Sequence, residues 1–107
     1  MEWKYEEGKI FSKNEQGEII AEADYLNMKN GMVDIEHVYV SPEYRGKGIA
    51  QQTMLAVVEY LRKEKLKATA SCSYANAWFK KNATEYEDVI AKELSNQSVS
   101  CKIDGKH

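Results

Sequence analysis

The chain has 107 residues, of which 43% are hydrophobic and 30% are charged, and its formal net charge is -2. These values are ordinary for one soluble globular domain, and the small negative charge gives no electrostatic support for nucleic-acid binding. The longest apolar run, 54–58, is far shorter than the roughly 20 residues that span a bilayer, and the polar start lacks the apolar core of a secretion signal, so we expect a cytoplasmic protein with no membrane partner.

Three strands joined by short polar turns are predicted in the first part of the chain, over 9–13, 18–26 and 32–40. Apolar residues alternate in the second strand, which indicates a sheet with one face on a core and one face in water. Because side chains alternate along a strand, we expect His37 on the same face as Ile35 and opposite to Glu36. Three such strands in succession predict an antiparallel meander.

An amphipathic helix is predicted over 48–65. Its apolar stripe is spaced four, three and four residues apart, at Ala50, Met54, Val57 and Leu61. A strand over 67–72 follows the helix directly, which favours a crossover to a parallel partner strand.

Two shorter helices are predicted beyond that strand, over 75–81 and 84–94. The second would begin with Thr84 as its N-cap. From residue 95 the composition turns polar, so we expect a single domain of residues 1–94 followed by a flexible tail over 95–107. Cys72 and Cys101 fit no metal-ligand spacing, so no metal is expected, and a disulfide between them is not expected in a reducing compartment.

The most informative stretch is 38–50, where a strand passes through a turn into the long helix. It reads Val-Tyr-Val-Ser-Pro-Glu-Tyr-Arg-Gly-Lys-Gly-Ile-Ala. A glycine-rich turn between a strand and a helix points backbone N–H groups at one spot, and the helix N-terminus adds about half a positive charge. The stretch therefore predicts an anion site suited to a phosphate or pyrophosphate. The alternative is a turn that uses glycine only to reverse the chain tightly.

The pattern Arg45-x-x-Gly48-x-Ala50 resembles the Q/R-x-x-G-x-G/A signature of the GNAT superfamily of N-acetyltransferases. The resemblance implies an α+β fold with a GNAT-like mixed sheet, in which an antiparallel meander is followed by a helix crossover and flanking helices. It also implies that acetyl-CoA is the cosubstrate, with its pyrophosphate on the loop amides and its pantetheine arm along the preceding strand. The residues that this assigns to coenzyme binding are Val38, Tyr39, Val40, Arg45, Gly46, Lys47, Gly48, Ile49 and Ala50.

The chain is also similar to the smallest single-domain members of this superfamily, over roughly residues 8 to 90. Their motifs fall on His37, on 45–50 and on Cys72-Ser73-Tyr74. Two departures are Val38, where relatives often carry Thr, and the segment 82–86, which lacks their proline.

The candidate catalytic residues are Cys72 and His37, since an imidazole can take a proton from an ammonium or activate a thiol. The alternatives are a small buried cysteine and a histidine at the rim of the core. Glu36 is an alternative base, because many GNAT enzymes use a glutamate on this strand. Tyr74, Asn76 and Lys80 are assigned to coenzyme contacts; Tyr74 could also protonate the leaving thiolate, and a solvated face is the alternative for the lysine.

Three readings of the function follow. The first is an acetyl-CoA-dependent N-acetyltransferase that acts on a small-molecule amine or on a protein or peptide amine. Direct transfer is expected, and a covalent route through Cys72 is left open. The second is a non-catalytic module that binds coenzyme A or acetyl-CoA, and a scaffold without any cofactor is a third reading. We expect a monomer or a weak homodimer.

Overall fold

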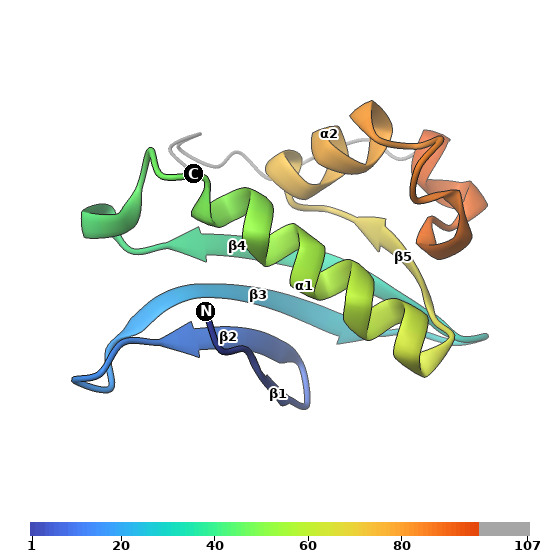
Figure 1. Cartoon of the computed structure of the whole chain (residues 1–107). Helices are drawn as coiled ribbons and strands as arrows, with labels where there is room; N and C mark the ends of the chain where they lie inside the picture. Colours follow the sequence, from blue (N-terminus) through green and yellow to red (C-terminus); the bar gives the residue numbers. More distant parts are fainter. Residues whose placement is uncertain (97–107) are drawn as a thin grey trace.

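A five-stranded mixed sheet forms the frame of the protein (Figure 1). The strands lie side by side in chain order: β1 (Lys4–Glu6), β2 (Lys9–Lys13), β3 (Ile19–Asn27), β4 (Met32–Val40) and β5 (Lys67–Ala70). The first four pair antiparallel, and β5 pairs parallel with β4. The computed structural model describes residues 1–96, and side chains as far as Leu94. The predicted α+β class, meander and parallel crossover are confirmed, whereas the three-residue β1 was not predicted.

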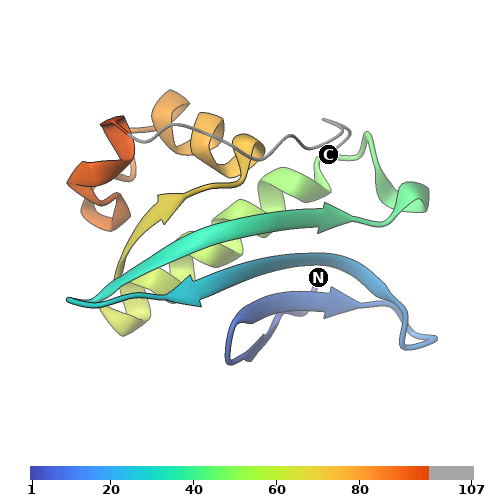
Figure 2. The ribbon, with the colours of Figure 1, turned by 180° about the vertical axis from the view of Figure 1, so that it is seen from behind.

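One face of the sheet is covered by the long helix α1 (Ile49–Glu64). The predicted stripe of Ala50, Met54, Val57 and Leu61 is buried, and most of it packs in one cluster with apolar side chains of β2, β3 and β4. Gly48 caps the start of α1 and Lys65 its end, both with left-handed backbone. Seen from behind, the opposite face of the sheet has no helix over it in the described part of the chain (Figure 2).

The junction between β5 and the next helix differs from the prediction. β5 ends at Ala70, and α2 (Ser73–Lys81) begins two residues before the predicted start. Cys72 is therefore the N-cap of α2, with extended backbone, and not the last residue of a strand. Phe79 and Trp78 anchor α2 in the core beside α1.

The prediction of one helix over 84–94 is wrong. This segment forms two short 3-10 turns, η2 (Glu87–Val89) and η3 (Lys92–Asn96). Between them Ile90 is extended and forms a parallel bridge with Ala68, and the Ala91 N–H donates to the Ala68 carbonyl at 2.9 Å. This pairing satisfies backbone groups at the edge of β5, which a helix over 84–94 would leave without partners. The contact with β5 therefore decides the conformation of the segment, despite the helix-capping pattern at Thr84.

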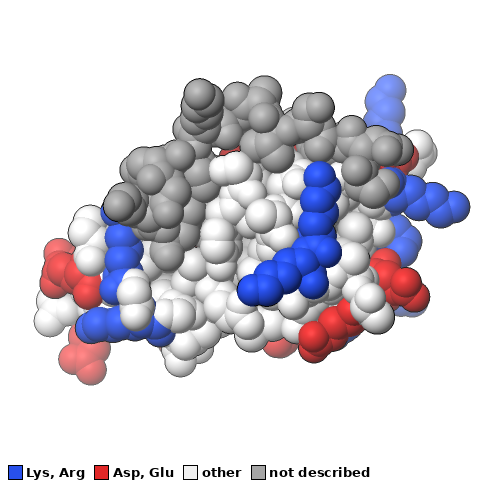
Figure 3. Space-filling model, turned by 90° about the horizontal axis from the view of Figure 1, so that it is seen from above, with Lys and Arg blue, Asp and Glu red and all other residues white. Residues whose placement is uncertain are grey.

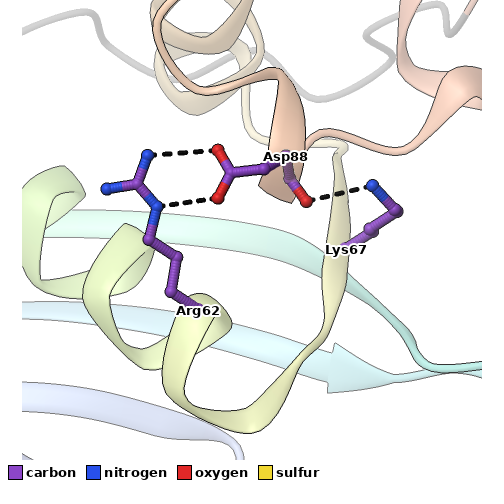
Figure 4. A network of polar contacts seen from close by, with 3 residues as sticks. All are labelled: Arg62, Lys67 and Asp88. Carbon is purple, nitrogen blue, oxygen red and sulfur yellow. Dashed lines mark hydrogen bonds and ion pairs between the residues drawn. The ribbon is translucent and has the colours of Figure 1, made fainter.

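An ion pair fastens this segment to the end of α1 (Figure 4). Arg62 binds Asp88 through two hydrogen bonds, Nε to Oδ2 at 2.8 Å and Nη2 to Oδ1 at 3.1 Å, and Lys67 Nζ donates to the Asp88 carbonyl at 3.0 Å. The guanidinium lowers the pKa of the Asp88 carboxyl. Arg62 also lies over the ring of Tyr86, which stacks on Trp78. Both charged groups are half exposed, so the pair orients the segment more than it stabilises the fold.

The predicted tail begins inside η3, at residue 95, and from 97 onward it lies outside the described residues, as does Cys101. Within residues 1–96, the helices are all too short or too polar to cross a membrane.

Candidate functional site

β4 and β5 separate midway along β4. Their ladder runs from Met32 opposite Lys67 to Ile35 opposite Ala70, and its last link is the Cys72 N–H, which donates to the Ile35 carbonyl at 3.1 Å. Beyond this point β4 continues to Val40 with β3 as its only neighbouring strand in the described part of the chain. The other edge of Val38–Val40 is therefore a strip of backbone that an extended ligand could pair with.

A β-bulge lies where the strands separate. His37 is opposite Asp24 and Ile35 is opposite Tyr25, so Glu36 is an extra residue in β4. The bulge reverses the alternation: Val38 is buried with Ile35 in the core, while Glu36 and His37 are both exposed. The prediction that His37 shares the Ile35 face is wrong, because strict alternation does not allow for an inserted residue.

The predicted anion site falls on the turn 41–48. After the 3-10 turn η1 (Pro42–Tyr44), the Arg45 Nε–H donates to the Val40 carbonyl at 3.0 Å, which ties the turn to the end of β4. Gly46 and Gly48 have φ of +80° and +76°, and a Cβ at either would meet no atom within 4 Å. Both glycines are thus required by backbone conformation, and space is open in front of them.

The first turn of α1 meets this open space. Its N-cap is Gly48, which offers no side-chain oxygen, so the leading N–H groups of the helix have no side-chain cap. Figure 3 views the side of the molecule that bears α2 and the turn; basic and acidic side chains both project at the end where the turn lies. The arrangement suits an anion.

Cys72 and Tyr74 lie on the other side of the gap between the strands. The Cys72 side chain is fully buried, and Tyr74, in the first turn of α2, is half-buried. The tyrosine packs against the main core and also against the cluster of Val40 and Ala50, so its ring spans from α2 to β4 and α1. Burial, and then the nearby Cys72 thiol, raise the pKa of Tyr74.

Two predicted contacts are placed differently. Asn76 is buried, and its Nδ2 donates to the Ala70 carbonyl at 3.0 Å, which is a structural role in holding α2 on β5. Lys80 borders a cavity of about 1120 Å³ together with Asn30 and Lys67, at the end of β5 that is remote from the glycine turn. The structure thus gathers the glycine turn, the Val38–Val40 edge, Cys72 and Tyr74, and leaves Lys80 apart.

Sequence reasoning missed a group of polar side chains on the helix-free face. Glu22 and Asp24 lie two apart in β3, and a hydrogen bond between their carboxyl groups, with burial, raises the pKa of Glu22 to about 7. Asp24 is the cross-strand partner of His37. The signal was present in the sequence, since residues two apart in a strand share a face.

The region from β2 to η2 is also the part of the chain that known proteins share. A family model described as GCN5-related N-acetyl-transferase matches residues 10–89. The chain belongs to the GCN5-related N-acetyltransferase family. A GCN5-like protein from Staphylococcus aureus, solved in solution by NMR, is 34% identical with a TM-score of 0.67, and the match covers 84% of this chain and 87% of that one.

The resemblance to the smallest members is confirmed as well. Protein NATD1 of Homo sapiens is 37% identical over 51 residues, which is 48% of this chain and 45% of that protein. The Gallus gallus protein matches at the same identity over 46% of its length, so the match spans about half of these curated relatives. A GNAT-family acetyltransferase from Staphylococcus aureus Mu50, at 13% identity and a TM-score of 0.55, shares the fold alone.

Proposed function

We propose that this chain is an acetyl-CoA-dependent N-acetyltransferase that moves the acetyl group directly to an amine. The observation that supports it most is the separation of β4 and β5 next to the glycine turn. It leaves a backbone edge at Val38–Val40, with the glycine turn at one end, Cys72 at the other, and Tyr74 packed beside Val40. Membership of the family supports the choice of cosubstrate.

The proposed binding mode follows from these three parts. The pyrophosphate would accept hydrogen bonds from the leading N–H groups of α1 and from the turn amides of Gly46 and Gly48. The pantetheine arm would pair with the free edge of Val38–Val40, as an added strand does. Arg45 holds the turn in place through its bond to the Val40 carbonyl, so its contribution is partly structural.

The chemistry would take place where the two strands part. The amine nitrogen attacks the thioester carbon, so a C–N bond forms and the C–S bond breaks. The proton that the ammonium must lose goes to His37 or Glu36, which the bulge exposes together. Tyr74 would protonate the departing thiolate, since a phenol hydroxyl carries its proton at neutral pH. Cys72, whose side chain is fully buried, would lie behind the site and form no acetyl intermediate.

A non-catalytic coenzyme-binding module is the second candidate. The observation that favours it is the uncovered face of the sheet beside His37, where no described helix walls in an acceptor (Figure 2). Both functions need the coenzyme site, but only the first needs turnover.

Binding and turnover are measured separately to test the proposal. Acetyl-CoA at 100 times its dissociation constant should stabilise the protein by about 2.7 kcal/mol in thermal denaturation. Release of free thiol should then depend on an added amine. Binding without thiol release for a broad amine panel would favour the module, and a missing thermal shift would contradict both.

Cys72→Ala should retain transfer; complete loss with intact binding and an acetyl-cysteine adduct in the wild type would establish the covalent route instead.

A further inference from the structure

A hollow of about 460 Å³ lies on the helix-free side of the sheet, near the end of β3 and the start of β4. Its described lining consists of Leu26, Met28, Met32, Asp34, Thr69 and Glu93. The side chains of Leu26 and Met28 are 54% and 43% exposed, so both present apolar surface to the hollow. The two charged residues of this lining are both acidic, so the hollow combines apolar walls with negative charge.

The acid at the floor of the hollow is well fixed. Asp34 is only 8% exposed, and it accepts a hydrogen bond from Thr69 Oγ1 at 2.6 Å and another from Ser71 Oγ. Both donors come from β5 and the residue just after it, so the carboxylate joins the two strands. A buried carboxylate held by two hydroxyl donors has a set position, which is what recognition of a ligand charge requires.

The hollow adjoins the proposed reaction centre. Asp34 precedes Ile35, whose carbonyl makes the last link to Cys72, and Ser71 precedes Cys72. On the helix-free face, the next side chain along β4 after Asp34 and the bulge is His37. A ligand in the hollow would therefore lie beside the point where β4 and β5 part, next to the residues to which we assign the ammonium proton.

We propose that this hollow binds the acceptor, and that the acceptor is a small primary amine with an apolar alkyl or aryl-alkyl body. The ammonium is drawn to Asp34 and Glu93, and the body contacts Leu26, Met28 and Met32. The volume lies in the lower part of the range for small-molecule sites, which favours a small amine over a folded protein. The inference rests on the proposed function, and its test is a binding measurement that needs neither acetyl-CoA nor turnover.

Binding can be followed by NMR through the methyl groups of the methionines. With ¹³C-methyl methionine, Met28 and Met32 report on the hollow, whereas Met54 in the core and Met1, beside a different cavity, serve as internal controls. Titration with phenethylamine and hexylamine should shift the Met28 and Met32 signals to saturation and leave those of Met1 and Met54 in place. Hexanoate and hexanol should bind at least about tenfold more weakly. Equal binding of hexanoate, or unmoved Met28 and Met32 signals, would overturn the proposal.

Matched variants locate the site. Leu26→Ser should weaken hexylamine binding about fivefold, because it removes apolar contact area. Leu55→Ser changes a similarly exposed leucine on α1 and should leave the affinity unchanged. Asp34→Asn should abolish the preference for the cation over hexanol, and Glu93→Gln, at an exposed position, gives the same test in case Asp34→Asn is poorly folded.

Three further outcomes are decisive. Met28 signals that depend on protein concentration without ligand would show that a second copy covers the hollow, which contradicts the proposal. If the protein binds amines but not acetyl-CoA, the proposed function is wrong and the amine site is supported. If it binds acetyl-CoA but no amine, the coenzyme site is supported and the hollow is not the acceptor site.

Discussion

Replacing the two glycines of the turn separates backbone strain from loss of the anion site. Gly46→Ala and Gly48→Ala each force a side chain into left-handed backbone, at φ of +80° and +76°, while the added Cβ meets nothing within 4 Å. Each variant should therefore lose about 1–2 kcal/mol of folding free energy from backbone strain alone, because the added Cβ clashes with no other atom. Gly17→Ala is the control, because Gly17 has φ of +82° and the same open surroundings but lies in the turn between β2 and β3.

The three variants should lose similar stability in urea denaturation but differ in coenzyme binding. In the turn, each Cβ projects into the space that the pyrophosphate would occupy. Losing one backbone hydrogen bond to a charged oxygen costs about 1.5–3 kcal/mol, which is about a 10- to 150-fold loss of affinity. Calorimetric titration with acetyl-CoA measures this directly. Equal affinity in Gly48→Ala and Gly17→Ala would refute the assignment of the pyrophosphate to this turn.

Three further predictions concern Tyr74, Glu22 and Phe79. Tyr74→Phe removes the proposed proton donor, so kcat should fall about 100-fold while the KM for acetyl-CoA changes little; an unchanged kcat would exclude the role. Because the pKa of Glu22 is raised to about 7 in the folded state, the folded protein binds an extra proton between about pH 4.5 and 7, and stability falls as pH rises through that window. Glu22→Gln should remove this fall and raise stability at pH 8 by about 1 kcal/mol or less, since the group is partly open to solvent; thermal melts at pH 5 and pH 8 that show no difference between variant and wild type would contradict it. Phe79→Ala should cost about 3–5 kcal/mol in urea denaturation, because Phe79 is fully buried, whereas Leu55→Ala at an exposed position should cost well under 1; similar losses would argue against the packing of α2.

The elements with a long, regular pattern were predictable from the sequence. The stripe of α1 continues for about three turns, and β4 has the predicted bounds. β1 was missed because three residues carry too little pattern to read. The segment 84–94 was mispredicted because its conformation is decided by the edge of β5, which is a partner that local sequence does not reveal.

Some parts of the candidate site were likewise predictable from the sequence, and others were not. The glycine turn was found through a motif, since its residue types are fixed by local backbone geometry. The exposure of His37 depends on a bulge, and the bulge is defined only against the neighbouring strand. The hollow around Asp34 brings together β3, β4, β5 and η3, so no local pattern could indicate it. The roles assigned to Cys72 and His37 stay predictions.

The bridge between Ala68 and Ile90 has a consequence for how the protein behaves when concentrated. An unpaired strand at the margin of a sheet is a template for aggregation, since another molecule can add to it. Here one margin is occupied by the chain's own segment around Ile90. The other margin, β1, is three residues long and carries exposed Lys4 and Glu6. These two margins therefore discourage fibre-like stacking, whereas the edge at Val38–Val40 stays open to pairing with another chain when no ligand lies on it.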